Sequence, residues 1–189
     1  MGVQDNLIIK STVWLLMLAV VLLLANCRQH AVKELKLFDF EFKEDLDRLN
    51  WNCHVIYGLD RRFVSQGKKS LKLEMYPPGS YPGMSTNSFE HDWSDYGKMC
   101  VDIFNPGKGQ LSLTLRIDDK EDYPPYEDRV NKSFLVKSGW NEICVELNGL
   151  LTSGTKRHLN LANITRLYLF TGHPQRPLIL YLDNIRLTQ

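Results

Sequence analysis

The sequence lacks an excess of charge of either sign. Its 189 residues contain 23 Lys and Arg against 22 Asp and Glu, for a formal net charge of +1 at pH 7. Proteins that bind nucleic acid or an anionic bilayer surface need a region of excess positive charge. A composition with almost equal numbers of basic and acidic residues does not indicate one. The composition therefore predicts no nucleic-acid partner.

The sequence also has no uncharged run that reaches the roughly 20 residues of a membrane-spanning helix. The run TVWLLMLAVVLLLA, residues 12–25, has 14 residues and follows Lys10. Its length and position are typical of the apolar core of a secretory signal. The LLANC stretch that ends it resembles the bacterial lipoprotein signal, in which the cysteine, here Cys27, becomes the lipidated first residue. Asn26 departs from that pattern, which prefers a small residue, so cleavage near Ala25 and an uncleaved signal-anchor remain alternatives.

These features predict an exported protein of the cell envelope or the extracellular space. Its membrane contact would come only through the N-terminal segment or a lipid on Cys27. We expect a signal peptide over residues 1–27, a polar tether over 28–36 and one domain over 37–189. About 150 residues are enough to bury a normal core.

Closely spaced cysteines are absent, which excludes a CxxC redox motif, a zinc knuckle and a framework of several disulfides. Beyond Cys27 the chain has Cys53, Cys100 and Cys144, so at most one disulfide can form within it. Cys100 and Cys144 lie in strand-like segments that could be neighbours and could pair. Buried free thiols are the preferred interpretation.

Catalytic motifs are missing as well. The five histidines occur singly, without HxH or HExxH spacing, and no GxSxG segment is present. A glycosidase-like acid pair needs one carboxyl in an apolar pocket. The acids of the IDDKED stretch, from Asp118 to Asp122, have polar neighbours instead and predict a solvated, mutually repelling loop. We therefore expect no enzymatic activity.

What the sequence does contain, past residue 36, is a succession of alternating apolar and polar positions separated by Gly, Pro and Asn. The clearest examples are SLKLEM (70–75), GKMCVDIF (97–104), LSLTLRI (111–117), EICVEL (142–147), ITRLYLF (164–170) and LILYLDNIRL (178–187). Alternation with a period of two is typical of half-buried strands. Only the stretches around 43–49 and 147–162 could hold short helical turns. The pattern predicts an all-β fold, an antiparallel two-sheet β-sandwich.

Several segments occur in an order and spacing that point to a known family. They are HDWSDYGKMCVDIFNPGKGQLSLTLRIDD (91–119), YEDRVN (126–131), SGWNEICVEL (138–147) and LYLDNIRL (180–187). In these segments the chain resembles the galactose-binding-like jelly-roll domains found as carbohydrate-binding modules of bacterial glycan-degrading enzymes, and the resemblance covers residues 37–189. It implies two antiparallel sheets, no catalysis, a polysaccharide or oligosaccharide partner, and often a structural calcium ion where the first and last strands meet.

Two carboxylates match the positions that the resemblance implies for calcium. In YLDNIRL, Asp183 shares its parity with Ile185 and Leu187, so a regular strand would turn its carboxylate toward the apolar side, where it needs a cation or strong donors. Glu41 matches the family's opening phenylalanine–glutamate pair, and the turn over 65–70 matches the one that lends backbone carbonyls. We expect Glu41 and Asp183 to be calcium ligands. The alternative is that Asp183 accepts backbone N–H groups of a turn, while Glu41 is a solvent-facing strand residue.

The stretch LRIDDKEDYPPYEDRVN, residues 115–131, is the candidate sugar site. A sugar site needs flat aromatic faces with planar polar groups at their edge, and the prolines between the two tyrosines stiffen the loop and reduce the ordering cost of binding. The predicted carbohydrate-binding residues are Tyr123, Tyr126, Asp118, Arg129 and Asn131. Alternatively, Asp118 and Arg129 form a structural pair between adjacent strands, with Arg116 offsetting the remaining acids.

Other aromatic residues offer further platforms. Tyr76 and Tyr81 lie in a second proline-stiffened loop, MYPPGSYPG, which is the alternative sugar rim. Trp51 is another candidate, whereas Trp93 and Trp140 lie at strand starts and are expected to be framework.

Two rival functions fit the same fold, because fold alone does not decide function. A protein-interaction or assembly domain would show a flat exposed apolar patch and no aromatic cleft. A small glycoside hydrolase or polysaccharide lyase would bring a histidine, a tyrosine or a carboxylate pair together in one cleft.

Overall fold

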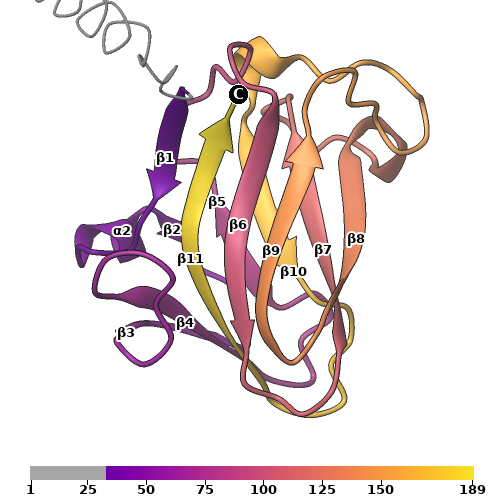
Figure 1. The fold of residues 1–189 in the computed structure, drawn as a ribbon. Coiled ribbons are helices and arrows are strands. Elements are labelled where there is room, and N and C mark those ends of the chain that lie inside the picture. The colour runs from indigo at the N-terminus through magenta and orange to yellow at the C-terminus, as the bar shows by residue number, and fades with distance from the viewer. Residues whose placement is uncertain (1–32) are drawn as a thin grey trace, which may run out of the picture. The chain divides into compact units, whose positions relative to one another are not determined.

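Two antiparallel sheets pack face to face in the computed structural model, which describes residues 33–189 (Figure 1). The first sheet has the order β3 (Val55–Asp60), β4 (Ser70–Met75), β11 (Leu178–Thr188), β6 (Lys98–Asn105) and β9 (Gly139–Glu146), and β1 (Glu34–Phe38) also pairs with β11. The second has the order β2 (Leu49–Asn50), β5 (Gly83–Thr86), β10 (Arg166–Phe170), β7 (Leu111–Asp118) and β8 (Val130–Val136). The predicted two-sheet β-sandwich is confirmed.

The core lies between the sheets and follows the alternation of the sequence. On β7, Leu113, Leu115 and Ile117 are fully buried, and on β10 so are Leu167 and Leu169. Since successive residues of a strand point to opposite faces, the positions between them face outward. Trp93, in the segment before β6, is also fully buried, as expected for framework.

The sandwich begins earlier than predicted and contains little helix. β1 starts at Glu34 and pairs with the last strand, so the final residues of the predicted tether belong to the sheet. The predicted signal peptide and residues 28–32 of the predicted tether lie outside the described residues. Helical turns form at α2 (Glu44–Asp47) and at the 3-10 helices η1 (Tyr126–Asp128) and η2 (Leu161–Asn163). Residues 33–189 contain no helix that is both long and apolar enough to cross a membrane.

Cys100 and Cys144 form a disulfide, so the preferred interpretation as free thiols is wrong for this pair. Their sulfur atoms are 2.02 Å apart. The register of β6 and β9 places the two residues directly opposite each other, and such cross-strand neighbours have the closest Cβ atoms in an antiparallel pair. Cys53 is free and exposed.

A bulge in β11 reverses the predicted direction of Asp183. The pairing of β11 with β6 shifts between Asp183 and Arg186, and Asn184 has a φ of 48°. Because a bulge inserts one extra residue, the core side carries Leu182 before it and Ile185 after it. Asp183 therefore lies on the outer side of the sheet, where it is buried against Ser65 and Gln66 of the loop between β3 and β4.

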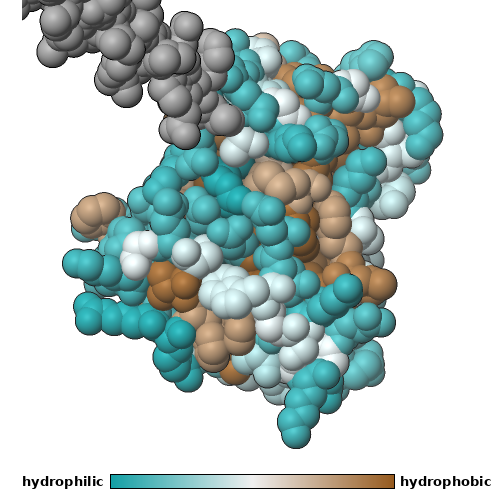
Figure 2. Space-filling model, in the orientation of Figure 1, coloured by the Kyte–Doolittle hydropathy of each residue, from teal (hydrophilic) through white to brown (hydrophobic). Residues whose placement is uncertain are grey.

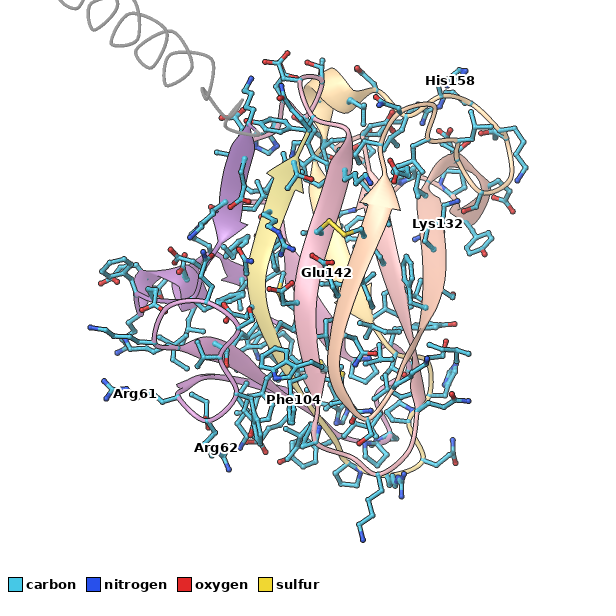
Figure 3. The ribbon with its side chains drawn as sticks, viewed as in Figure 1. Arg61, Arg62, Phe104, Lys132, Glu142 and His158 are labelled. Carbon is cyan, nitrogen blue, oxygen red and sulfur yellow. A yellow bond between two sulfur atoms is a disulfide. The ribbon has the colours of Figure 1, made fainter. Side chains whose placement is uncertain are left out.

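An aromatic cluster closes part of this outer side. Phe104 of β6 (Figure 3) stacks on Phe63 at 3.9 Å between ring centroids, and both rings contact Tyr181. Trp140 packs edge-on against Phe104. Figure 2 shows this side as apolar and weakly polar residues set among hydrophilic ones. The cluster fixes the loop that carries Phe63 and Ser65 over the first sheet.

Candidate functional site

The outer face of the second sheet carries two rows of polar and aromatic side chains. Arg116 of β7 lies opposite Asn131 of β8 and Tyr168 of β10. The next outward position, Thr114, lies opposite Ser133 and Phe170 in the same way. The ladder therefore brings together residues that are up to 56 positions apart in the sequence, as Thr114 and Phe170 are.

These rows form the floor of a cleft of about 350 Å³. β5 and β8 flank β10 and β7, so the residues that precede them, Tyr81 and Tyr126, enter the cleft from opposite sides. The lining residues are Tyr81, Thr114, Arg116, Tyr126, Arg129, Asn131, Ser133, Tyr168 and Phe170. A neighbouring hollow of about 520 Å³ shares Tyr126 and Asn131 with the cleft.

One side of the cleft is built from three aromatic rings. Tyr168 and Phe170 lie 4.7 Å apart between ring centroids, and Tyr81 meets Phe170 edge-on at 5.6 Å. The Tyr168 hydroxyl donates to the backbone oxygen of Tyr81 and accepts from the Asn52 side chain at 2.8 Å. Burial raises the pKa of Tyr168, so its hydroxyl stays protonated at neutral pH. These contacts hold the loop that carries Tyr81 against the sheet.

Asp118 lies at the end of β7, on the same face as Arg116 but outside the cleft lining, and is paired with two arginines. It is completely buried. Its two oxygens accept from Arg116 Nε and Nη2 at 2.8 and 2.6 Å, and from Arg166 at 2.8 Å. The predicted structural pair of Asp118 with Arg129 is therefore wrong, because Arg116 lies two positions away on the same face and takes its place. Bidentate pairing of this kind fixes the direction of a guanidinium, so Asp118 positions Arg116.

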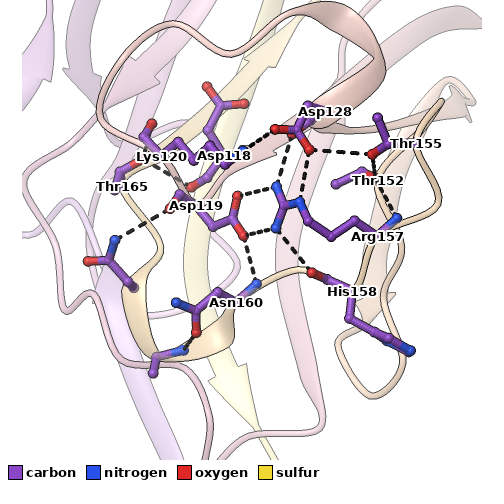
Figure 4. A network of polar contacts seen from close by, with 12 residues as sticks. Asp118, Asp119, Lys120, Asp128, Thr152, Thr155, Arg157, His158, Asn160 and Thr165 are labelled. Carbon is purple, nitrogen blue, oxygen red and sulfur yellow. Dashed lines mark hydrogen bonds and ion pairs between the residues drawn. The ribbon is translucent and has the colours of Figure 1, made fainter.

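The loop that follows β7 is not the solvated, repelling loop that its acids predicted. Asp119 is buried and accepts two hydrogen bonds from Arg157, which also donates to Asp128 (Figure 4). Burial opposes the ionisation of Asp119, but the hydrogen bonds from Arg157 and Asn160 outweigh it and lower its pKa. Hydrogen bonds from Lys120 and Arg157 lower the pKa of Asp128 to about 2. The ion pairs hold the loop in one conformation.

The two predicted tyrosines of this loop lie at different places. Tyr126 is 60% exposed and lines the cleft, with the Arg129 guanidinium 5.8 Å from its ring centroid. Tyr123 is 78% exposed and is not among the lining residues. Its ring covers the Arg166 guanidinium at 4.0 Å, a cation–π contact. Tyr123 therefore lies beside the cleft.

Arg129 and Asn131 line the cleft, and each has an unpaired donor. Arg129 Nε and Asn131 Nδ2 are buried and have no hydrogen-bond partner. Within residues 33–189, Arg129 forms no ion pair. Burial and the nearby charge of Arg116 lower the pKa of Arg129. Buried donors without partners are costly, so both groups are poised to bind a ligand with acceptor oxygens.

The structure brings together three of the five predicted residues, Tyr126, Arg129 and Asn131. It also unites them with Tyr81 of the alternative rim, so the two predicted rims belong to one cleft. Arg116, Thr114, Ser133, Tyr168 and Phe170 were missed. The alternation in LSLTLRI and ITRLYLF identifies these residues of β7 and β10 as outward-facing. Only the strand register shows that they lie side by side.

The remaining aromatic candidates lie elsewhere. Trp51 is 83% and Trp140 49% exposed, and neither is a lining residue of the cleft. Trp140 rests on the outer side of the first sheet, where it packs edge-on against Phe104 as framework. Tyr76 donates its hydroxyl to Glu74.

The carboxylates of Glu41 and Asp183 both contact the loop between β3 and β4, but their surroundings do not fit a calcium ion. Glu41 Oε1 accepts from the backbone N–H groups of Lys68 and Lys69, at 2.6 and 2.9 Å. Asp183 Oδ2 accepts from the backbone of Ser65 and Gln66. The loop thus offers N–H donors to both carboxylates, whereas calcium needs oxygen ligands.

A lysine adds to this mismatch, because the Lys69 ammonium donates to the backbone oxygen of Glu41 at 2.7 Å. The arrangement supports the alternative in which Asp183 accepts backbone N–H groups of a turn. Glu41 also accepts backbone N–H groups, so it is not the solvent-facing strand residue of that alternative. The two carboxylates therefore form no ready calcium site in this arrangement, and calcium binding stays an untested prediction from the sequence.

No protein-family model and no curated protein sequence matches this chain. Solved structures do. A family 11 carbohydrate-binding module from Clostridium thermocellum, in complex with a β-1,3-1,4-mixed-linked tetrasaccharide, has a TM-score of 0.64 at 19% identity, over 83% of this chain and 96% of that one. This chain thus has the β-sandwich fold seen in these carbohydrate-binding modules.

Enzyme chains contain the same fold as one part. An exo-β-agarase matches with a TM-score of 0.66 at 18% identity, over 80% of this chain and 25% of the agarase. The CBM22-1–GH10 modules of a Clostridium thermocellum xylanase, complexed with xylohexaose, match with a TM-score of 0.57 at 13% identity, over 83% of this chain and 28% of the xylanase. The chain thus spans about a quarter of each enzyme chain.

Proposed function

We propose that this protein binds a polysaccharide or oligosaccharide in the cleft of the second sheet and does not cleave it. The cleft itself carries the proposal, since aromatic rings from both sides flank a floor of hydroxyl, amide and guanidinium groups. Sugars present C–H surfaces that stack on aromatic faces and hydroxyls that pair with planar polar groups. The similarity in fold to a module bound to a tetrasaccharide supports the same function.

The chemistry of the lining supports binding without catalysis. Glycoside hydrolysis uses two carboxyl groups on either side of the scissile bond. The described residues that line the cleft include neither a carboxylate nor a histidine. Asp118, at the end of β7, is not a lining residue and pairs with Arg116 and Arg166.

Export and tethering form part of the same proposal. They rest on the apolar run over 12–25 and on Cys27, and they would place the glycan at a cell surface. The mass of the mature N-terminal peptide distinguishes lipidated Cys27 from cleavage near Ala25 and from an uncleaved anchor.

The test is glycan-array binding followed by calorimetry on the full chain in mild detergent. We expect the double variant Tyr81→Ala/Tyr126→Ala to bind the best glycan of the wild type with an affinity at least about ten-fold lower, because stacking on both sides of the cleft is lost. Trp140→Ala is the matched control, since it removes an exposed aromatic ring from the other sheet. It should bind as the wild type does.

Two results would overturn the proposal. The first is a folded wild-type protein that binds no glycan, which would favour a protein-interaction domain. The second is a loss of binding in Trp140→Ala that equals the loss in the double variant. That result would place the site on the first sheet instead of the second.

A further inference from the structure

The cleft concentrates positive charge in a protein whose overall charge is nearly balanced. Three guanidinium groups, those of Arg116, Arg129 and Arg166, surround one carboxylate, Asp118. Arg116 and Arg166 share that carboxylate. Arg129 is left without an ion-pair partner within residues 33–189, although Glu127 is near enough to influence it.

Two further acids of this region, Asp119 and Asp128, are engaged elsewhere. Asp119 and Asp128 pair with Arg157, and Asp128 also pairs with Lys120. They therefore do not offset the charge of Arg129.

The neighbouring hollow continues the positive character. Its charged lining residues are Lys132, Lys156 and Glu146. Glu146 pairs with Lys98 at 3.0 Å. A glycan chain that leaves the cleft past Tyr126 and Asn131 would thus meet Lys132, which forms no ion pair within residues 33–189, and both hollows favour an anionic occupant.

Arg129 is suited to recognise one particular group. Its guanidinium is a planar fork of donors that matches a carboxylate or a sulfate with two parallel hydrogen bonds. The ring of Tyr126 lies beside it. A sugar stacked on Tyr126 would therefore present a ring substituent to Arg129 and to the unpaired amide of Asn131.

We propose that the ligand of this cleft is an acidic glycan, whose carboxylate or sulfate group binds Arg129 while the sugar rings stack on the aromatic walls. This inference rests on the proposed carbohydrate-binding function and specifies its ligand class. A neutral glycan would leave the buried donor of Arg129 to pair only with hydroxyls, which is a weaker interaction than a charge-assisted hydrogen bond.

The test compares matched polymers that differ only in charge. Polygalacturonate and its methyl ester test the carboxylate, and κ-carrageenan and its desulfated form test the sulfate. Calorimetry on the full chain in mild detergent should show at least one acidic polymer binding about ten-fold tighter than its uncharged partner. Raising the salt concentration should weaken the binding of the acidic polymer and leave the binding of its uncharged partner unchanged.

Variants locate the effect. Arg129→Gln should lose the preference for the acidic polymer, and Arg129→Lys should keep part of it, because the charge remains and the fork is lost. Lys108→Gln removes one positive charge from the exposed turn between β6 and β7, and should behave as the wild type does. If Arg129→Gln does not fold, the comparison of Arg129→Lys with Lys108→Gln decides.

The outcomes separate the two proposals. Equal binding of the acidic and uncharged polymers, or equal losses in the Arg129 and Lys108 variants, overturns the acidic ligand and leaves carbohydrate binding intact. Binding to none of the polymers, and to none of the glycans of the array, overturns both.

Discussion

At the scale of single residues, Arg157 does most to shape the loop beside the cleft. Its guanidinium donates to both oxygens of Asp119 and to Asp128, and it also reaches the backbone oxygens of Asp128 and His158 (Figure 4). One side chain thus ties the segment after β7 to the loop over 152–160. Asp119, which the sequence predicted to lie in a solvated and repelling loop, and Asp128 instead help to hold the loop that carries Tyr126 and Arg129.

This role predicts the effect of Arg157→Gln. It would leave the buried carboxylate of Asp119 without its charged partner and lower the stability at pH 7 by about 2 kcal/mol, or about 4–8 °C in Tm. Differential scanning calorimetry measures the change. Lys137→Gln, which removes an exposed positive charge after β8, is the control and should unfold near the wild-type Tm.

The same ion pairs set a dependence on pH. The folded-state pKa values of Asp119 and Asp128 are lowered from 3.8, that of Asp128 to about 2. Their contribution to stability is present above the unfolded pKa and is lost as the pH falls toward about 2. The wild-type Tm should therefore drop over this range, and Arg157→Gln should show a smaller drop. An equal drop in both proteins would contradict the role of Arg157.

At the scale of elements, alternation identified the strands well but could not place them against one another. SLKLEM and LSLTLRI became β4 and β7 because burial of one face sets both the pattern and the strand. β5 has only four residues, one of them Gly83, and forms through pairing with β10. A Cβ at Gly83 would lie 2.0 Å from the backbone oxygen of Leu169, a close approach that no periodicity reveals.

The bulge of β11 shows the same limit. Parity predicted that Asp183 points toward the core, and one extra residue at Asn184 reversed it. The sequence also predicted only part of the cleft, because strand pairing cannot be read from the sequence. Tyr126, Arg129 and Asn131 are neighbours in the sequence, whereas Tyr168 and Phe170 join them only through the ladder between β10 and β7.

The loop between β3 and β4 carries a prediction about calcium. Its N–H groups already occupy oxygens of Glu41 and Asp183, and Lys69 supplies a positive charge. We expect the Tm to be the same within error in calcium and in chelator. A protein that binds calcium only when folded would instead gain about 2.7 kcal/mol at a hundred-fold excess over Kd. A rise of several degrees in calcium would show that the loop rearranges to expose carbonyl oxygens.

At the scale of the whole domain, the two sheets divide the work. The first sheet carries the Cys100–Cys144 disulfide, the bulge and the aromatic cluster of Phe63, Phe104 and Tyr181. The second carries the cleft on three paired strands, β10, β7 and β8. Because the floor of the cleft is a continuous ladder and its loop is held by ion pairs, we expect the cleft to be formed before any ligand binds.

A preformed cleft makes a quantitative prediction. Ligand that binds only the folded state raises the unfolding free energy by RT ln(1 + [L]/Kd), about 2.7 kcal/mol at a hundred-fold excess over Kd. For a domain of this size that is about 5–10 °C in Tm. The rise measured by calorimetry should match the one calculated from the separately measured Kd, with no change in the circular dichroism of the folded protein. A rise well above the calculated value, or a gain in ordered structure on binding, would mean that the glycan organises the loops of Tyr81 and Tyr126 instead of finding them in place.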